Sequence, residues 1–289
     1  MAEKDQTCSS ASSCSRESCE GCPSREGGAG PESFRAEQNA SSDIRHVIGV
    51  VSGKGGVGKS LVTASLANAL AKSGARVGIL DADITGPSIP KMYGLTGPAE
   101  VMGETSILPG ITRNGIKVMS LNLIMEDPEQ AVIWRGPVIA GVVKQFWTDV
   151  VWGELDYLLV DMPPGTGDVP LTVFQSLPVD GIFIVTSPQD LVQLIVTKAL
   201  NMAKLMDIPV LGIIENYSWL SCPDCGRKIE VFGKSRIEEI AKKTGLALAG
   251  RIPVESSYSR KADEGKFEEV DNEYIRDAMD CLRKAAGKR

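Results

Sequence analysis

The 289-residue sequence has no apolar run close to the roughly 20 residues that a membrane-spanning helix requires. Its first twenty residues are polar and lack the apolar core of a secretory signal. Basic residues are outnumbered by acidic ones, 31 to 37, so the formal net charge of −6 gives no general attraction to nucleic acid or anionic lipid. These absences predict a cytoplasmic protein that binds neither a membrane nor nucleic acid.

Histidine is also nearly absent. His46 is the only one, at the start of an apolar segment, which argues against histidine-based catalysis or a histidine-rich metal site. Cysteine is present seven times, but no cysteine lies between residues 22 and 222. In a reducing compartment, such cysteines indicate metal ligation or free thiols rather than disulfides.

The first 43 residues differ from the rest of the chain. They are rich in Ser, Gly and Glu and have almost no large apolar side chain, so they cannot form a core. We therefore predict a flexible tail over 1–43 and a folded domain over 44–289. The tail carries four cysteines, which could hold a 4Fe–4S cluster or a zinc ion, or could be reactive thiols of a disordered segment: Cys8, Cys14, Cys19 and Cys22.

Short apolar runs alternate with helical patterns along the remainder. Runs that fit strands buried on both faces occupy 46–52, 76–80, 156–161, 181–186 and 210–216. A helical pattern over 189–206 has one apolar face, formed by Leu191, Leu194, Ile195, Ala199, Met202 and Met206, and a terminal helix has a narrow apolar stripe of Ile275, Ala278, Met279 and Leu282. The segment 95–128 could form a short hairpin. The alternation predicts an α/β fold with a doubly wound, mostly parallel sheet and helices on both faces.

A phosphate-binding motif follows the first predicted strand. Residues 53–60 match G-x-x-x-x-G-K-[ST] and lead into a helix predicted over 61–71, which is the context this motif requires. Its glycines let backbone N–H groups surround phosphate oxygens, and the helix N-terminus adds partial positive charge. The predicted nucleotide ligands are Gly53, Lys54, Gly55, Gly56, Val57, Gly58, Lys59 and Ser60. Lys59 would contact the β- and γ-phosphates, and Ser60 would ligate Mg²⁺.

Three aspartates follow predicted strands near this loop. Asp161 ends the strand in "LLVDMPPGTGD", where it can hold the Mg²⁺ shell. Asp81 and Asp83 end another strand, in "ILDADITGPS". Asp81 is a further predicted metal ligand, and one of the two carboxylates could orient a water for attack on the γ-phosphate. Each alone could be an ordinary loop residue, but three at strand ends around one phosphate loop favour an ATP site with Mg²⁺.

A C-x-x-C motif, "CPDCG", lies in a loop after a predicted strand. Cys222 and Cys225 can ligate one metal centre, but a closed site needs four ligands. A structural zinc half-site, a redox pair and an iron–sulfur site that bridges two subunits are all compatible with the spacing. The redox alternative is weak because no helix of a thioredoxin-like unit follows.

These motifs resemble a known family. "KGGVGKS" is similar to the deviant Walker A loop of the MinD/ParA/nitrogenase-iron-protein class of P-loop ATPases, and "DADITGPSIP", "VDMPPGTGD" and "IIENYSWLSCPDCG" together resemble the Mrp/ApbC iron–sulfur cluster carriers over roughly residues 45–265. The resemblance implies that Lys54 reaches the partner's phosphates across a nucleotide-sandwich dimer. It further implies that Asp83 positions water, that Asp161 is the switch II aspartate, and that Asn216 contacts adenine. Some members carry an amino-terminal four-cysteine motif, although the spacings of their eukaryotic version differ from those here.

The resemblance implies a homodimeric ATPase that shares a 4Fe–4S cluster between Cys222 and Cys225 of two subunits. Such a carrier would exchange clusters with an assembly scaffold and apo iron–sulfur proteins. One alternative is a MinD/ParA-type positioning ATPase with a structural zinc site. An electron donor like the nitrogenase iron protein is a further alternative, but that protein bridges its cluster with single cysteines near its switch regions, where this chain has none.

Overall fold

A computed structural model describes residues 35–83, 86, 88–103, 106–125, 136–165, 167–188 and 192–287. The chain from Arg35 onward forms one compact unit. Its first residues pack on that unit, since the Ala36 N–H donates to the Ser176 carbonyl at 2.9 Å and the Trp147 indole donates to the Ala36 carbonyl at 3.0 Å. The tail and its cysteines Cys8, Cys14, Cys19 and Cys22 lie outside the described residues, so the predicted tail and its boundary at residue 43 stay predictions.

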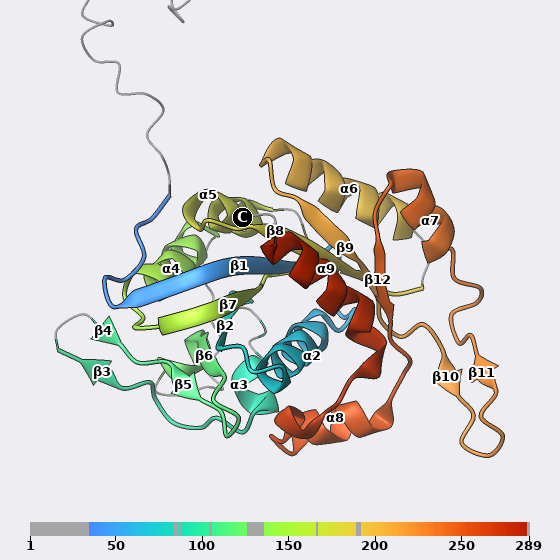
Figure 1. Cartoon of the computed structure of the whole chain (residues 1–289), viewed down its shortest axis with the longest axis horizontal. Coiled ribbons are helices and arrows are strands. Elements are labelled where there is room, and N and C mark those ends of the chain that lie inside the picture. The colour runs from blue at the N-terminus through green and yellow to red at the C-terminus, as the bar shows by residue number, and fades with distance from the viewer. Residues whose placement is uncertain are drawn as a thin grey trace, which may run out of the picture. The chain divides into compact units, whose positions relative to one another are not determined.

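One eight-stranded sheet runs through this unit, in the order β12-β9-β8-β1-β7-β2-β6-β5 (Figure 1). Seven strands are parallel, and β5 alone is antiparallel, to β6. The strands are β1 (Ser42–Ser52), β2 (Val77–Asp81), β5 (Gly110–Ile111), β6 (Lys117–Ser120), β7 (Gly153–Asp161), β8 (Gly181–Thr186), β9 (Val210–Glu215) and β12 (Leu248–Arg251). This mostly parallel sheet confirms the predicted fold class.

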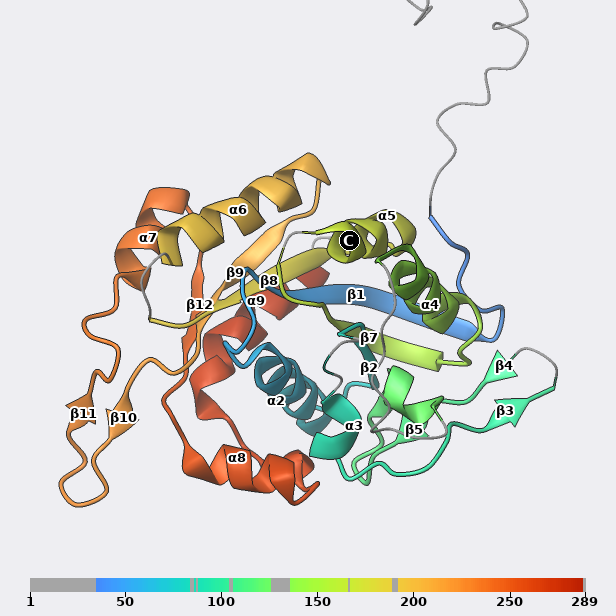
Figure 2. The ribbon, with the colours of Figure 1, turned by 180° about the vertical axis from the view of Figure 1, so that it is seen from behind.

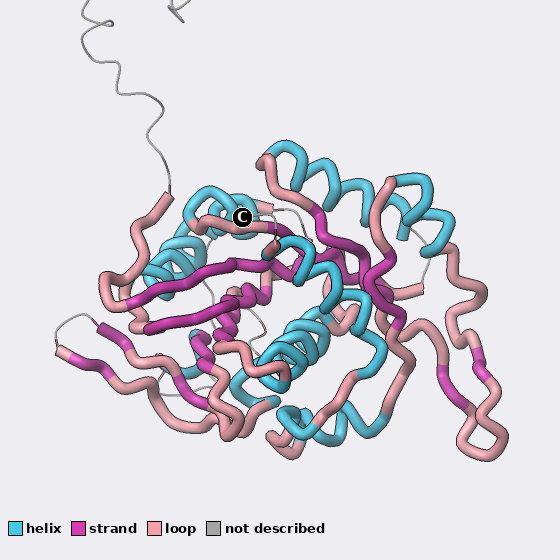
Figure 3. Tube along the Cα trace, in the orientation of Figure 1, coloured by secondary structure: helices cyan, strands magenta, loops and turns pink. Residues whose placement is uncertain are grey.

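Helices cover both faces of the sheet, as Figures 2 and 3 show from opposite sides. One hydrophobic cluster joins one face to α2 (Lys59–Lys72), α3 (Ile89–Met92) and α9 (Arg276–Ala286). A second cluster joins the other face to α4 (Gly136–Thr148), α5 (Asp168–Ser176), α6 (Val192–Leu205) and α7 (Ile237–Thr244). A further helix, α8 (Ser256–Asp263), and 3-10 turns at Leu121–Leu123, Phe267–Glu269 and Glu273–Ile275 complete the helical elements described. Strands that are covered on both faces must be apolar throughout, which explains their continuous hydrophobic runs.

The five predicted strands correspond to β1, β2, β7, β8 and β9. The predicted terminal stripe is buried, with Ile275 in the 3-10 turn before α9 and its other three residues on α9. The predicted apolar face of α6 is partly wrong. Leu194 is 50% exposed, whereas Val196 and Ala203 are buried beside Ala199 and Met202. Packing against β8 and β1 therefore rotates the helix relative to its most apolar stripe.

Two small antiparallel pairs stand outside the main sheet. β3 (Val101–Met102) pairs with β4 (Ser106–Ile107) within the segment where a short hairpin was predicted. β10 (Leu220–Ser221) pairs with β11 (Lys228–Ile229), and the turn between them contains the C-x-x-C motif. This hairpin lies beyond the β12 edge of the sheet (Figure 1). The carboxyl ends of β1, β2, β7, β8 and β9 meet at one edge of the sheet, which is where parallel α/β folds bind ligands.

Candidate nucleotide site and cysteine hairpin

The phosphate loop connects β1 to α2. It begins directly after Ser52 and ends at Gly58, and α2 starts at Lys59. Gly56 and Gly58 have φ angles of 77° and 76°, a left-handed conformation that glycine adopts without a steric penalty. Val57 between them is buried in the core, so the loop is anchored. A glycine-rich loop in front of a helix N-terminus can present backbone N–H groups to a phosphate.

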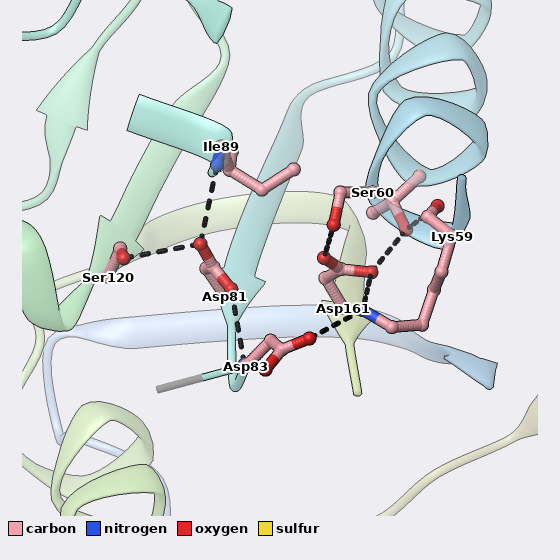
Figure 4. A network of polar contacts seen from close by, with 8 residues as sticks. Lys59, Ser60, Asp81, Asp83, Ile89, Ser120 and Asp161 are labelled. Carbon is pink, nitrogen blue, oxygen red and sulfur yellow. Dashed lines mark hydrogen bonds and ion pairs between the residues drawn. The ribbon is translucent and has the colours of Figure 1, made fainter. Parts of the chain in front are cut away.

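Asp161, at the end of β7, is fully buried and is the centre of the polar network in Figure 4. Its Oδ1 accepts hydrogen bonds from Lys59 Nζ at 2.8 Å and Thr63 Oγ1 at 2.9 Å. Its Oδ2 accepts from Ser60 Oγ at 2.5 Å. The first turn of α2 is thus attached to the end of β7, and Thr63 is a member of this network that the sequence reading missed.

Lys59 lies between two carboxylates. Its ammonium is 2.8 Å from Asp161 Oδ1 and 3.5 Å from Asp83 Oδ2. Burial is the largest influence and disfavours the charge, but the carboxylates of Asp161, Asp83 and Asp81 together raise the pKa of Lys59. Lys59 therefore stays positively charged at neutral pH, the state needed to bind phosphate oxygens.

Asp81 pairs in register with Asp161 across β2 and β7 but has different partners. Its oxygens accept from the backbone N–H groups of Asp83 and Ile89, at 3.2 and 3.4 Å, and from Ser120 Oγ at 3.2 Å (Figure 4). Burial, followed by the charge of Asp161, raises the pKa of Asp81 to about 8. Asp81 thus supports the segment that carries Asp83, and its predicted role as a metal ligand would require loss of this proton.

A pocket of about 480 Å³ opens above the phosphate loop. This volume is within the range of pockets that enclose small ligands. The loop, Ser60 and Asp83 line it together with residues from elements far along the chain: Ser88, Lys91, Pro164, Tyr217, Ser259 and Asp263. No sequence signal predicts the α8 residues, because nothing local in α8 indicates that it lies over the phosphate loop.

Asn216 lies beneath the phosphate loop. It is buried, its backbone N–H donates to the Thr186 carbonyl at 2.8 Å, and its Nδ2 donates to the Val57 carbonyl at 3.0 Å. The next residue, Tyr217, has a φ of 59° and faces the pocket. Contact of Asn216 with adenine and the reach of Lys54, which is half-buried in the loop, to a partner subunit both stay predictions.

Cys222 and Cys225 lie in the turn between β10 and β11. The Cys222 N–H donates to the Arg227 carbonyl and the Gly226 N–H donates to the Cys222 carbonyl, each at 2.9 Å, with Gly226 at a φ of 69°. Both thiols are free, Cys222 half-buried and Cys225 exposed. Backbone N–H groups of Cys225 and Asp224 donate toward the Cys222 sulfur and lower its pKa. The turn therefore favours the thiolate, which is the form that binds metals.

A four-ligand metal site would need two ligands beyond the two cysteines of the hairpin. Within the described ranges, no three His, Cys, Asp or Glu side chains are grouped so that they could hold a metal ion. Cys281 is half-buried on α9, and burial raises the pKa of its thiol. His46 lies on β1 with Nδ1 3.6 Å from Asp180, away from the phosphate loop. A metal site on the hairpin would therefore need ligands from outside the described part of one chain.

Comparison with known proteins gives consistent similarities. The family model described as ParA, NUBPL iron-transfer P-loop NTPase, matches residues 43–286. An iron-sulfur cluster carrier protein of Methanocaldococcus jannaschii is 47% identical over 253 residues, 86% of this chain and 87% of that protein. One of Clostridium perfringens is 47% identical over 234 residues, 78% of this chain and 82% of that protein. The matched range includes both the phosphate loop and the cysteine hairpin.

Solved structures are similar in the same region. A nucleotide-binding protein from Archaeoglobus fulgidus, in complex with ADP, is 44% identical with a TM-score of 0.72, covering 81% of this chain and 91% of that one. The MinC:MinD cell division complex of Aquifex aeolicus contains a chain that is 21% identical, with a TM-score of 0.58, covering 84% of this chain and 96% of that one. The second likeness concerns the fold alone.

Proposed function

Because this chain belongs to the ParA/NUBPL family of iron-transfer P-loop NTPases, among them the iron–sulfur cluster carriers, we propose that it binds and hydrolyses ATP and carries a 4Fe–4S cluster to apo-proteins. The observation that carries this proposal is the pair of free thiols, Cys222 and Cys225, held on a projecting hairpin of a P-loop NTPase fold. A positioning ATPase has no need of such a pair.

The nucleotide part of the proposal assigns roles to the residues around the phosphate loop. The loop glycines and Lys59 hold the β- and γ-phosphates. Hydroxyl and carboxylate oxygens are the donors that Mg²⁺ prefers, and Ser60 and Asp161 present both kinds side by side. Bound Mg²⁺ would offset phosphate charge. Asp83, which lines the pocket, orients the attacking water.

The cargo part of the proposal requires a second copy of the chain. A 4Fe–4S cluster is held by four thiolates, and the hairpin offers two. A two-fold axis brings identical loops together, so the same hairpin of a second subunit completes the set. Lys54 would act across the same interface, on the nucleotide of the partner. Homodimer formation therefore serves both sites.

We propose a cluster-assembly scaffold as donor and apo iron–sulfur proteins as acceptors, in a cytoplasmic setting that keeps the thiols reduced. No helix in the described ranges is long and apolar enough to cross a membrane. The amino-terminal cysteines Cys8, Cys14, Cys19 and Cys22, outside the described residues, remain a proposed second site for a 4Fe–4S cluster or zinc.

Anaerobic reconstitution with iron and sulfide tests the proposal. The full chain should gain a brown, oxygen-sensitive chromophore with iron and sulfide in the dimer fraction. A Cys222→Ala/Cys225→Ala variant should lose the bridging cluster, whereas a variant with alanine at the four amino-terminal cysteines should keep it. Cluster transfer to an apo-ferredoxin, with and without ATP, then measures carriage. A colourless dimer with stoichiometric zinc on the hairpin would overturn the carrier function and favour a positioning ATPase.

A further inference from the structure

Glu215 is a buried carboxylate at the base of the cysteine hairpin. It is the last residue of β9 and has no accessible surface. Its Oε2 accepts from Ser218 Oγ at 2.7 Å and Arg251 Nε at 3.2 Å, and its Oε1 accepts from Ser235 Oγ at 2.5 Å. A buried charge is tolerated only when it is paired and hydrogen-bonded in this way.

The two serines lie at opposite ends of one excursion of the chain. Ser218 immediately precedes the segment 219–234, which contains β10, β11 and both cysteines, and Ser235 immediately follows it. Through these two hydrogen bonds, the Glu215 carboxylate joins the residue before the hairpin segment to the residue after it. This connection stabilises the hairpin, because two strands of two residues each form only a marginally stable structure by themselves.

Aromatic and basic side chains strengthen the same base. The Arg251 guanidinium is 5.7 Å from the ring centre of Trp219, and the Lys228 ammonium of β11 is 4.1 Å from it. Both distances are within the range of cation–π attraction. Trp219, at the entry of the hairpin, is thus in contact with β11 and with Arg251 of β12.

The neighbour of Glu215 contacts the nucleotide site. Asn216 Nδ2 donates to the Val57 carbonyl of the phosphate loop, and a Cβ at Gly58 would lie 2.1 Å from the same Nδ2, so the Asn216 side chain lies directly against the loop backbone. Two consecutive residues at the end of β9 therefore hold the phosphate loop on one side and the cysteine hairpin on the other.

We propose that Glu215 is a positioning residue that transmits the nucleotide state of the phosphate loop to the accessibility of Cys222 and Cys225. The sequence of contacts is Val57, Asn216, Glu215, and then Ser218 and Ser235. Nucleotide binding shifts Asn216 with the loop, and Glu215 carries the shift to both ends of the hairpin. This inference rests on the proposed function, in that it links the two sites named there.

Thiol reactivity in the cluster-free, full-length protein tests the link. Under anaerobic, reduced conditions, N-ethylmaleimide labelling of Cys222 and Cys225 is followed by peptide mass spectrometry, with and without Mg²⁺ and a non-hydrolysable ATP analogue. Cys281 serves as an internal reference. We expect the analogue to change the labelling rate about fivefold, the lower end of typical coupling between sites. Glu215→Ala should reduce that response to less than about twofold while analogue affinity stays within about threefold of wild type.

Matched variants separate the link from a general loss of structure. Glu238→Gln removes the other carboxylate near Arg251, at 3.5 Å, without touching either end of the hairpin, and should keep the full response. Glu215→Gln keeps a polar side chain of the same length at this position. It should therefore show most of the nucleotide-dependent labelling response that Glu215→Ala loses. If Glu215→Ala does not fold, Ser235→Ala releases the exit alone and should at least halve the response.

An unchanged labelling response in Glu215→Ala or Ser235→Ala would overturn the proposed link through Glu215. The link would also be overturned if the analogue left the labelling rates of Cys222 and Cys225 unchanged in the wild-type protein. Failure of the carrier function has a different signature. A protein that shows the nucleotide-dependent labelling but takes up no iron and sulfide would retain the link through Glu215 and lose the proposed cargo.

Discussion

The Asn216 side-chain amide donates a hydrogen bond of 3.0 Å to the Val57 carbonyl, joining the end of β9 to a phosphate loop 159 positions earlier in the chain. The loop therefore rests on a second strand end as well as on α2. Its close fit leaves no room for a side chain at Gly58, where a Cβ would lie 2.1 Å from Asn216 Nδ2 and 2.9 Å from the Tyr217 hydroxyl. This contact makes the loop sensitive to substitution in a way that its glycine content alone does not indicate.

Gly58→Ala should destabilise the nucleotide-free protein by at least about 2 kcal/mol, because it adds left-handed backbone strain to overpacking. Gly55→Ala is the matched control, since its Cβ would meet no atom within 4 Å and its φ is not left-handed. Urea unfolding of the two variants measures the difference. Equal stabilities would contradict the close contact between the loop and Asn216.

Lys54→Ala should keep ATP affinity, because Lys59 still holds the phosphates, but should lose ATP hydrolysis. A cationic residue that acts on a partner's nucleotide typically contributes about a thousandfold or more to the rate. Equilibrium binding of a fluorescent ATP analogue and steady-state phosphate release measure the two properties separately. Normal turnover in Lys54→Ala would count against a trans-acting role for this lysine.

Cys222 should react with alkylating agents at lower pH than Cys281. The N–H groups of Cys225 and Asp224 lower the pKa of Cys222, whereas burial raises the pKa of Cys281 above its ordinary value. Since the thiolate is the reactive form, the midpoint of the labelling profile lies at lower pH for Cys222 and at higher pH for Cys281 than for an ordinary thiol. Peptide mass spectrometry over a pH series gives both midpoints.

A Cys225→Ala variant is the control for that profile. It keeps the backbone N–H groups of residues 224 and 225, so the Cys222 midpoint should stay below that of Cys281. If Cys222 titrated at or above Cys281 in either protein, the hairpin would not be favouring the thiolate.

Asp81→Asn should change how stability depends on pH. The folded state raises the pKa of Asp81 from 3.8 to about 8, so between these values the native protein holds a proton that the unfolded chain has lost. Titration of Asp81 therefore lowers the free energy of unfolding as pH rises from about 4 to about 8, by up to about 1.4 kcal/mol per pH unit. The variant should lack that contribution.

Denaturant unfolding from pH 5 to pH 8.5 measures the effect. The stability of Asp81→Asn relative to wild type should increase across the range and level off above pH 8. A constant difference between the two proteins would show that Asp81 titrates at the same pH in the folded and unfolded chains.

Local sequence signals predicted much of this fold and part of the site. Continuous apolar runs predicted the buried parallel strands, and the phosphate motif predicted a loop that leads into α2, because both depend on neighbouring residues. The prediction for the apolar face of α6 was partly wrong: Leu194 is exposed and Val196 is buried. Contact with β8, rather than the local pattern, sets the rotation of the helix.

The residues that the sequence reading missed act through distant partners. Thr63 looks like an ordinary helix residue until β7 brings Asp161 to within 2.9 Å of its hydroxyl. Tyr217 and the α8 residues reach the pocket only because β9 and α8 end near the phosphate loop. In the sequence, Glu215 is one more charged residue at the end of a strand, and only its partners Ser218, Ser235 and Arg251 identify it as the base of the hairpin.

By itself, the sequence determined which side chains are available and where each local element begins: a glycine-rich loop before a helix, aspartates at strand ends, and two cysteines in a turn. The tertiary structure alone decided which of them meet. Strand order places Asp81 beside Asp161 and Asn216 beneath Val57, and burial there raises one carboxyl pKa while leaving Lys59 charged. Hydrogen bonds and charges act over a few ångströms in space, and separations of a hundred or more residues in the chain are closed only by folding.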